Sequence, residues 1–220
     1  IMPLLPHSHD TINYALNSPP PTKPSKINIL GTDDQARDIF ARLIYGLKTS
    51  LIFAILLTLI SSIIGIFLGA LQGYLGGKFD ILMQRFVEIW SGLPVIFILI
   101  ILASFITPNF WWLLFIMILF NWISLVGPVR AEFLKARNLE YVLAAKAMGV
   151  SELRIITKHI LPNAMISALT FIPFILSGAI IMLTSLDFLG FGLPVGSASI
   201  GEILAPVSYT HLRAHETVSD

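Results

Sequence analysis

The stretch Glu140–Asn163 reads EYVLAAKAMGVSELRIITKHILPN and separates two strongly apolar parts of the chain. It has helix-forming residues on both sides of a single glycine, Gly149, and carries charges of both signs. Pro162 near its end is expected to stop the second half before the next apolar segment. The pattern therefore predicts two short polar helices joined at Gly149.

The composition places the surrounding chain in a membrane. Of the 220 residues, 55% are hydrophobic and 12% are charged, and the mean hydropathy is +0.82. Soluble domains carry about 25% charged residues, so this chain has too few for an ordinary soluble surface. It contains no cysteine, which excludes structural disulfides, thiol catalysis and cysteine-ligated metal sites.

Four apolar segments are predicted to cross the bilayer, whose hydrocarbon core takes about 20 helical residues. They are expected at residues 50–74, 86–106, 111–126 and 164–186. Pro94 lies inside the second segment and predicts a kink there, because proline removes a backbone hydrogen bond. The predicted fold is an all-α polytopic membrane protein.

Small residues recur at every fourth position of the first segment, which places them on one helix face. They are Ser61, Gly65, Gly69 and Gly73. Such a face lets a second helix approach closely. General membrane-helix composition also supplies glycines, but the regular spacing favours a helix-packing surface.

Glu88, Pro94 and Asn121 are candidate features of a substrate path through the second and third segments. Asn121 would equally well form a hydrogen bond with a neighbouring helix. Proton-driven carriers need ionisable residues inside the membrane, and these segments hold almost none. The sequence also lacks a phosphate-binding loop, a zinc motif and a nucleophile elbow. The chain is therefore expected to be no enzyme and to hold no metal.

Loop charges predict the orientation of the chain. The cations of the 130–163 insert are Arg130, Lys135, Arg137, Lys146, Arg154 and Lys158, and those of the 76–85 turn are Lys78 and Arg85. They outnumber the acidic residues in both loops, so the positive-inside rule places both on the cytoplasmic side. Residues 1–48 and the loop after Leu186 are then expected outside.

The first short helix of the insert has one face suited to a flat, close contact. That face is formed by Tyr141, Ala144, Ala145 and Met148. Gly149 is expected to end the helix as a C-cap. A helix lying on lipid headgroups would show a similar pattern, so the residues alone leave protein docking and lipid contact open.

The second short helix is expected to begin at Ser151, as its N-cap, with Glu152 in its first turn. Leu153, Ile156 and Ile160 would form its apolar stripe, while Arg154 and Lys158 point elsewhere.

The stretch YVLAAKAMGVSELRIITKHILPN resembles the EAA loop of bacterial ABC-transporter permeases. The matching residues are Ala144, Ala145, Gly149, Leu161 and Pro162, while Leu143 stands where the motif has Glu. GTDDQARD at 31–38 and SLDFLGFGLP at 185–194 resemble the dipeptide and oligopeptide permeases of this binding-protein-dependent family. TINYALNSPPPTKP with GTDDQARD is most similar to the branch linked to peptide and microcin C uptake.

The resemblance implies the transmembrane subunit of an ATP-driven importer for peptides or peptide-like compounds in the bacterial inner membrane. Members have six spans and cytoplasmic coupling helices that sit in a cleft of an ATPase, so four of an expected six spans would be present here. The implied ATPase-coupling residues are Tyr141, Ala144, Ala145, Met148, Gly149, Leu161 and Pro162.

The same resemblance implies the partners of the chain. They would be cytoplasmic ABC ATPase subunits, a second homologous permease subunit, an extracytoplasmic substrate-binding protein and membrane lipid, with no nucleic acid. ATP and Mg would bind to the ATPase, and no cofactor to this chain. The alternative is a gradient-driven secondary carrier or a channel that works without an ATPase.

Three parts of the chain are expected. Residues 1–48 would be an extracytoplasmic segment with a short amphipathic helix near 34–47, and its His7 and His9 would lie in a solvated loop. Residues 49–204 would form the permease transmembrane domain, incomplete by one span at each end. In residues 205–220, VSYTHLRAHET resembles a reading frame of a sequencing adapter, so this tail is expected to be non-native.

Overall fold

The computed structural model of the chain describes residues 8, 10–14, 19–26, 28–194 and 196–204. The expected non-native tail, His7 and His9 lie outside these residues. The described residues form two compact units, which fall within residues 1–54, 103–113 and 180–220 and within residues 55–102 and 114–179.

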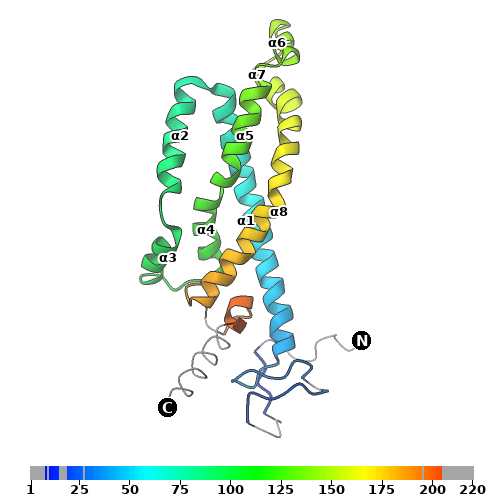
Figure 1. Ribbon diagram of the computed structural model, residues 1–220, viewed down its shortest axis with the longest axis vertical. Coiled ribbons are helices and arrows are strands. Elements are labelled where there is room, and N and C mark those ends of the chain that lie inside the picture. Colours follow the sequence, from blue (N-terminus) through cyan, green and yellow to red (C-terminus); the bar gives the residue numbers. More distant parts are fainter. Residues whose placement is uncertain (1–7, 9, 15–18, 27, 195, 205–220) are drawn as a thin grey trace, which may run out of the picture. The chain divides into compact units, whose positions relative to one another are not determined.

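Helices make up the regular structure of the described part (Figure 1), in which β pairing is limited to two isolated bridges. The elements are α1 (Ile39–Leu75), α2 (Gly77–Ser91), α3 (Val95–Ala103), α4 (Phe110–Asn121), α5 (Ile123–Ala136), α6 (Glu140–Ala147), α7 (Glu152–Ile155), the π-helical turn η1 (Ile156–Ile160) and α8 (Leu161–Phe188). The predicted all-α class is confirmed.

Three helical stretches of the described residues are long and apolar enough to cross a membrane. They span residues 39–75, 110–136 and 152–188. The pair α2 and α3 gives a fourth if its two halves form one span, and the two halves meet at a bend of 59°. The bend falls at Pro94, between the two helices, where the sequence predicts a kink. The expectation of a polytopic membrane protein is confirmed, with three to four candidate spans.

The first span differs from its prediction, because no separate short helix forms near residues 34–47. Instead α1 begins at Ile39 and continues without a break to Leu75. Asp38 precedes it, and its carboxylate accepts a hydrogen bond of 3.0 Å from the Phe40 N–H, which satisfies a free donor of the first turn. The 37 residues of α1 extend about 55 Å, well beyond a hydrocarbon core of about 30 Å.

The last span also differs from its prediction, because Pro162 does not end a helix. Residues 152–188 form one continuous helical stretch through α7, η1 and α8. Just before Pro162 the helix widens into a π turn, in which the Leu161 N–H donates to the Ile156 carbonyl. This local widening accommodates the proline, which in a regular α-helix would clash with a carbonyl one turn earlier.

In the first unit, the segment before α1 is fixed by a buried group of charges. Asp33 accepts hydrogen bonds from Arg37 Nε at 2.8 Å and from Arg42 Nη1 at 2.6 Å. Burial alone would raise the pKa of Asp33, but the hydrogen bonds from Arg37 and Arg42 outweigh it and hold the pKa below its ordinary value. Arg42 also lies 3.1 Å from Glu202, which ties the start of α1 to the segment that follows α8.

Candidate functional site

The helix α6 ends in a Schellman motif centred on Gly149. The Gly149 N–H donates to the Lys146 carbonyl at 3.0 Å, and the Val150 N–H donates to the Ala145 carbonyl at 3.1 Å. Gly149 has a φ of 78°, which L-residues with a side chain adopt only with strain. The predicted break at Gly149 is therefore a sharp, hydrogen-bonded turn, and it ends α6 at a fixed point.

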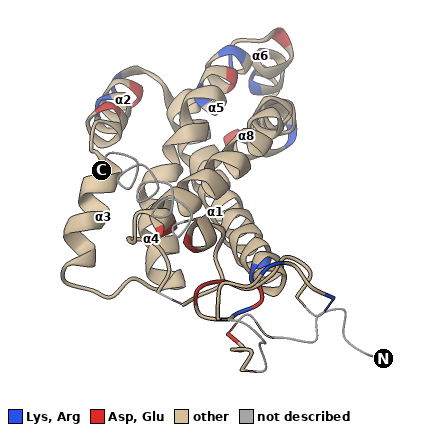
Figure 2. Cartoon of the chain, turned by 60° about the horizontal axis from the view of Figure 1, so that its bottom comes forward, with Lys and Arg blue, Asp and Glu red and all other residues tan. Residues whose placement is uncertain are grey.

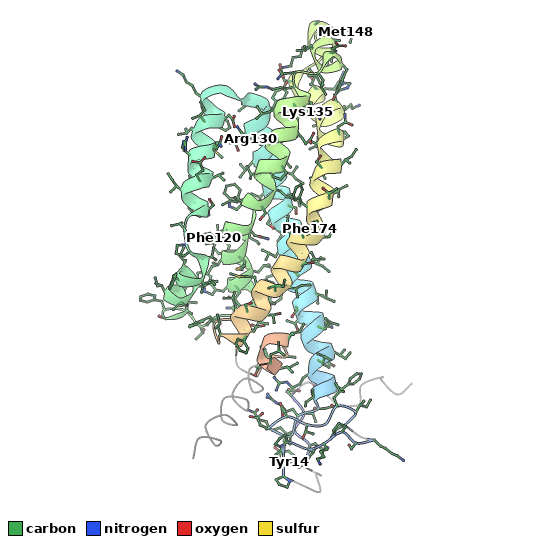
Figure 3. The ribbon with its side chains drawn as sticks, viewed as in Figure 1. Tyr14, Phe120, Arg130, Lys135, Met148 and Phe174 are labelled. Carbon is green, nitrogen blue, oxygen red and sulfur yellow. The ribbon has the colours of Figure 1, made fainter. Side chains whose placement is uncertain are left out.

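The surface of α6 is divided between an exposed and a buried side. Met148 is 77% exposed and Tyr141 42% exposed, and Ala144 is exposed between them. Figure 3 shows Met148 at the tip of the loop that contains α6. Val142 and Ala145 are buried at 0% and 3%. The structure thus separates Ala145 from the face on which the sequence places it, because Ala145 packs inward with Val142.

The buried side of α6 rests on a core cluster contributed by α5, α7, η1 and α8. Its members are Leu125, Val129, Phe133, Ala136, Val142, Ala145, Ile155, Ile160, Ala164 and Ala168. Apolar side chains that interdigitate at this density resist rearrangement. We therefore expect α6 to move together with α5 and α8 rather than independently of them.

The π turn changes which residues of the second short helix face the core. Ile155 and Ile160 are fully buried five residues apart, which matches the i to i+5 repeat of a π turn. Leu153, which a regular helix would place on the buried stripe, is instead 74% exposed. Ser151 occupies the N-cap position of α7 as expected, but its hydroxyl makes no capping hydrogen bond there.

Polar contacts further fix α6 to its surroundings. Lys146 Nζ lies 4.9 Å from the centre of the Tyr74 ring of α1 and 3.7 Å from Glu152. Asn163 Nδ2 donates to the Tyr141 hydroxyl at 3.3 Å. Leu161 packs partly against the core cluster, whereas the neighbouring Pro162 is exposed. The expected coupling residues therefore have different surroundings, with Tyr141, Ala144, Met148, Gly149 and Pro162 at the surface.

The small residues of α1 lie against the backbone that runs from Trp122 into α5. A Cβ at Gly69 would lie 2.8 Å from the Val126 carbonyl oxygen, and one at Gly73 would lie 2.5 Å from that of Arg130. Gly65 makes the same kind of approach to the Trp122 carbonyl. The approach recurs at every fourth residue of both segments, so the two backbones stay close over three turns. Ser61 continues this line, as its hydroxyl accepts a hydrogen bond of 3.3 Å from Asn121.

The three candidate residues of the substrate path lie in different surroundings and contact different neighbours. Glu88 is paired with Arg85 at 2.5 Å on an exposed part of α2. Asn121 binds Ser61, which corresponds to the helix-bonding alternative. Pro94 is exposed between α2 and α3. The hydrogen bonds and ion pairs of the described residues do not join these three residues into one site.

Sequence reasoning missed an ion pair that joins α2 to α5. Arg130 binds Asp80 through two contacts, Nε to Oδ1 at 2.5 Å and Nη2 to Oδ2 at 2.6 Å. Gln72 of α1, 1% exposed, donates to the Asp80 carbonyl at 3.1 Å. The two charged residues are 50 positions apart, so no local pattern links them. The only signal was that each lies at the edge of an apolar segment.

Within the long helical stretches of the described chain, the charged residues lie towards the ends and leave the middle portions uncharged. Figure 2 shows further charged residues on α2, around α6 and in the segment before α1. Among the described residues, no group of three or more His, Cys, Asp or Glu side chains is placed to hold a metal ion. The arrangement around α6 is an exposed protein surface on a packed support.

Comparison with known proteins places this arrangement in a family. Residues 61–208 match the family described as the binding-protein-dependent transport system inner membrane component. The chain belongs to this family. The match covers α6, Gly149 and the whole of α8, so the predicted resemblance is confirmed and the chain is a multi-pass protein of the bacterial inner membrane.

Individual relatives agree with the family. The chain is 58% identical over 194 residues to the inner membrane ABC transporter permease protein YejE of Escherichia coli (strain K12), covering 88% of this chain and 57% of the relative. It is 56% identical over 189 residues to the peptidoglycan transport system permease protein YejE of Agrobacterium fabrum, covering 86% and 50%.

A more distant relative is the dipeptide transport system permease protein DppC of Bacillus subtilis. It is 35% identical over 178 residues, which cover 81% of this chain and 56% of the relative. The chain therefore spans about half the length of the relatives that it matches.

Proposed function

We propose that this chain is a transmembrane permease subunit of an ATP-driven importer, and that α6 is its docking surface for a cytoplasmic ABC ATPase. The single observation that carries the proposal is the two-sided character of α6. Its exposed side offers Tyr141, Ala144 and Met148, while its buried side is packed on α5 and α8. A partner that displaced this helix would displace the spans beneath it.

Protein docking fits α6 better than lipid contact does. A helix that lies on a bilayer has one continuous apolar face directed to the lipid. Here the most apolar positions of α6 are divided, since Val142 faces the core cluster while Leu143 and Met148 are exposed on other sides. Small Ala144 lies between the exposed Tyr141 and Met148, which leaves room for close contact with a partner.

The proposed orientation places α6 and the α1–α2 turn on the cytoplasmic side. Both regions are rich in Lys and Arg, as the positive-inside rule requires. Residues 1–48 would then lie outside, where an extracytoplasmic substrate-binding protein delivers the cargo. Residues 49–204 would provide the membrane domain, next to a second homologous permease subunit and to lipid.

Peptides or peptide-like compounds are the proposed cargo. Relatives are named for dipeptide, oligopeptide and peptidoglycan transport. We further propose that the line from Ser61 to Gly73 serves as a helix-packing surface. Glu88, Pro94 and Asn121 stay candidates for the path, with Pro94 favoured because the other two already bind neighbours.

The proposed chain performs no hydrolysis itself, and ATP and Mg would bind to the ATPase subunits. Energy would reach the membrane domain only through the contact at α6. This separates the proposal from a gradient-driven carrier or channel, which would work without such a partner.

Co-purification tests the proposal at a single side chain. The chain is expressed together with the ABC ATPase subunits of a transporter of its family from the same bacterium, as wild type and as Met148→Asp and Met148→Leu. We expect the ATPase to co-purify with wild type and with Met148→Leu, which keeps the apolar volume, and to be reduced at least about tenfold with Met148→Asp. Equal ATPase recovery with all three chains would refute docking at α6.

A further inference from the structure

We propose that the Asp80–Arg130 ion pair is a latch through which α5 positions α2, so that movement of α6 reaches the second span. The link to transport rests on the function proposed above, whereas the latch itself rests on the geometry of the second unit. Asp80 and Arg130 are positioning residues, and neither is assigned contact with the cargo. Arg130 is labelled on α5 in Figure 3.

Within the described residues, α2 is attached mainly near its two ends. Asp80 is the buried residue of this helix, at 8% exposure, while apolar side chains such as Leu82 and Ile89 are 70% and 73% exposed. At its other end, Trp90 donates from Nε1 to the Leu119 carbonyl at 2.9 Å and stacks on Phe120. A helix held mainly at its two ends can change direction when one of these attachments moves.

The chain is deformable on both sides of α2. Gly76 and Gly77 have φ angles of 63° and 58°. A Cβ at Gly77 would meet no atom within 4 Å, whereas Gly76 is buried against the Arg137 guanidinium. Past Ser91, the helix axis bends by 59° where α3 begins. Consecutive glycines offer little resistance to rotation, and a proline break lacks the hydrogen bonds that stiffen a helix. The helix α2 is therefore flanked by two backbone breaks, at which we expect its direction to change most easily.

The ion pair is suited to fix the direction of α2. Its two parallel N–H···O contacts set both the distance and the angle between the guanidinium and the carboxylate. Gln72 holds the Asp80 backbone at the same point, so α1, α2 and α5 meet there. Asp80 and Arg130 side chains are 11% and 25% exposed, so water screens the pair less than it screens an exposed pair.

Arg130 lies on the same helix, α5, as residues that pack beneath α6. One turn later on α5, Phe133 belongs to the core cluster that holds Val142 and Ala145 of α6. Arg137, at the end of α5, donates to the Tyr74 carbonyl at 3.3 Å and so reaches the last turn of α1. A displacement of α6 would therefore move α5, and the ion pair would transfer that movement to α2.

The first experiment measures coupling in the complete transporter. Asp80→Asn and Arg130→Gln each break the pair, and the exchange Asp80→Arg with Arg130→Asp restores opposite charges. Lys78→Gln is the matched control, because it removes an exposed charge from the same turn of α2. Substrate transported per ATP hydrolysed is measured in proteoliposomes, together with ATPase recovery and the melting temperature of the complex.

We expect Asp80→Asn and Arg130→Gln to lower transport per ATP at least tenfold, with ATPase recovery unchanged and with partial rescue by the exchange. Lys78→Gln should behave as wild type. Unchanged transport per ATP in the single variants would overturn the latch. A loss of assembly that fully accounts for the loss of transport would also overturn it, since the pair would then only stabilise the fold.

The second experiment needs no ATPase, so it separates failure of the latch from failure of the proposed function. The chain has no cysteine, and nitroxide labels at Gln84→Cys on α2 and Lys135→Cys on α5 would be unique. Pulsed electron resonance should give one narrow distance distribution for the chain in nanodiscs. Asp80→Asn should widen or shift it, and an identical distribution in this variant would refute the latch even if ATPase docking holds.

Discussion

Gly73 of α1 lies directly against Phe133 of α5, so that a Cβ at Gly73 would come within 2.6 Å of the Phe133 Cβ. Phe133 is fully buried in the core cluster under α6 and cannot move aside without disturbing it. This contact of Gly73 is therefore also a point where α1 meets the support of the proposed docking helix.

Gly73→Leu is predicted to destabilise the membrane domain, because a large side chain would be forced into backbone and a packed aromatic residue. Overpacking of this kind costs about 1–3 kcal/mol or more. Gly178→Ala is the control, since a Cβ at Gly178 would meet no atom within 4 Å. Thermal unfolding in nanodiscs should show a lower melting temperature for Gly73→Leu alone, and equal melting of both variants would contradict the packing.

The same substitution at two neighbouring alanines of α6 should affect different properties, namely ATPase binding at Ala144 and stability of the fold at Ala145. Ala144→Glu places a charge at an exposed position and should change the free energy of unfolding by less than about 0.5 kcal/mol while preventing ATPase recovery. Ala145→Glu buries an unpaired charge in the core cluster, which costs on the order of several kcal/mol. Melting temperature and ATPase co-purification, measured on both variants, distinguish them. If both retained wild-type stability, the assignment of the two sides would be wrong.

Gly149 should tolerate asparagine better than alanine. Its φ of 78° lies in the left-handed region, which costs an ordinary L-residue about 1–2 kcal/mol, whereas asparagine visits it more readily. A Cβ would meet no atom within 4 Å there, so the whole effect comes from the backbone. Hydrogen exchange at Val150, which donates across the turn, should accelerate in Gly149→Ala more than in Gly149→Asn. The reverse order would exclude the Schellman turn.

At acidic pH, the segment before α1 should lose the ion pairs that Asp33 makes with Arg37 and Arg42. The pKa of Asp33 is lower in the folded chain than its ordinary value of 3.8, so Asp33 stabilises the fold above that value. This contribution is lost as the pH falls from 3.8 through the folded pKa. Pepsin cleavage before α1 should therefore increase over this range in the wild type, while Asp33→Asn should already be cleaved faster at the upper end. Asp34→Asn, an exposed neighbour, should follow the wild type.

The membrane class and the family could be predicted because both depend on patterns within one segment. Apolar length predicts a span wherever it lies, and the residues around Gly149 carry the family motif in a continuous stretch. Helix ends were less predictable. The first span begins at Ile39, ahead of its apolar core, since the chain from Ile39 to Leu75 contains no proline to stop it.

The sidedness of the candidate site could not be predicted, for physical reasons. Alanine is equally compatible with an exposed and a buried position, so Ala145 gave no sign that it packs with Val142. The π turn shifts the buried stripe from Leu153 to Ile155. No pattern in the sequence predicts a π turn at this position. The Asp80–Arg130 pair joins distant positions, and only the folded chain brings them together.

Site-specific photo-crosslinking at α6 tests the central claim most directly. A photoreactive amino acid replaces Met148, which is 77% exposed on α6, or Phe174, which is 76% exposed within α8. In membranes that contain the assembled transporter, the probe at position 148 should capture the ATPase subunit and the probe at position 174 should not. Capture of the ATPase at 174 but not at 148, or capture of lipid alone at 148, would contradict docking through α6.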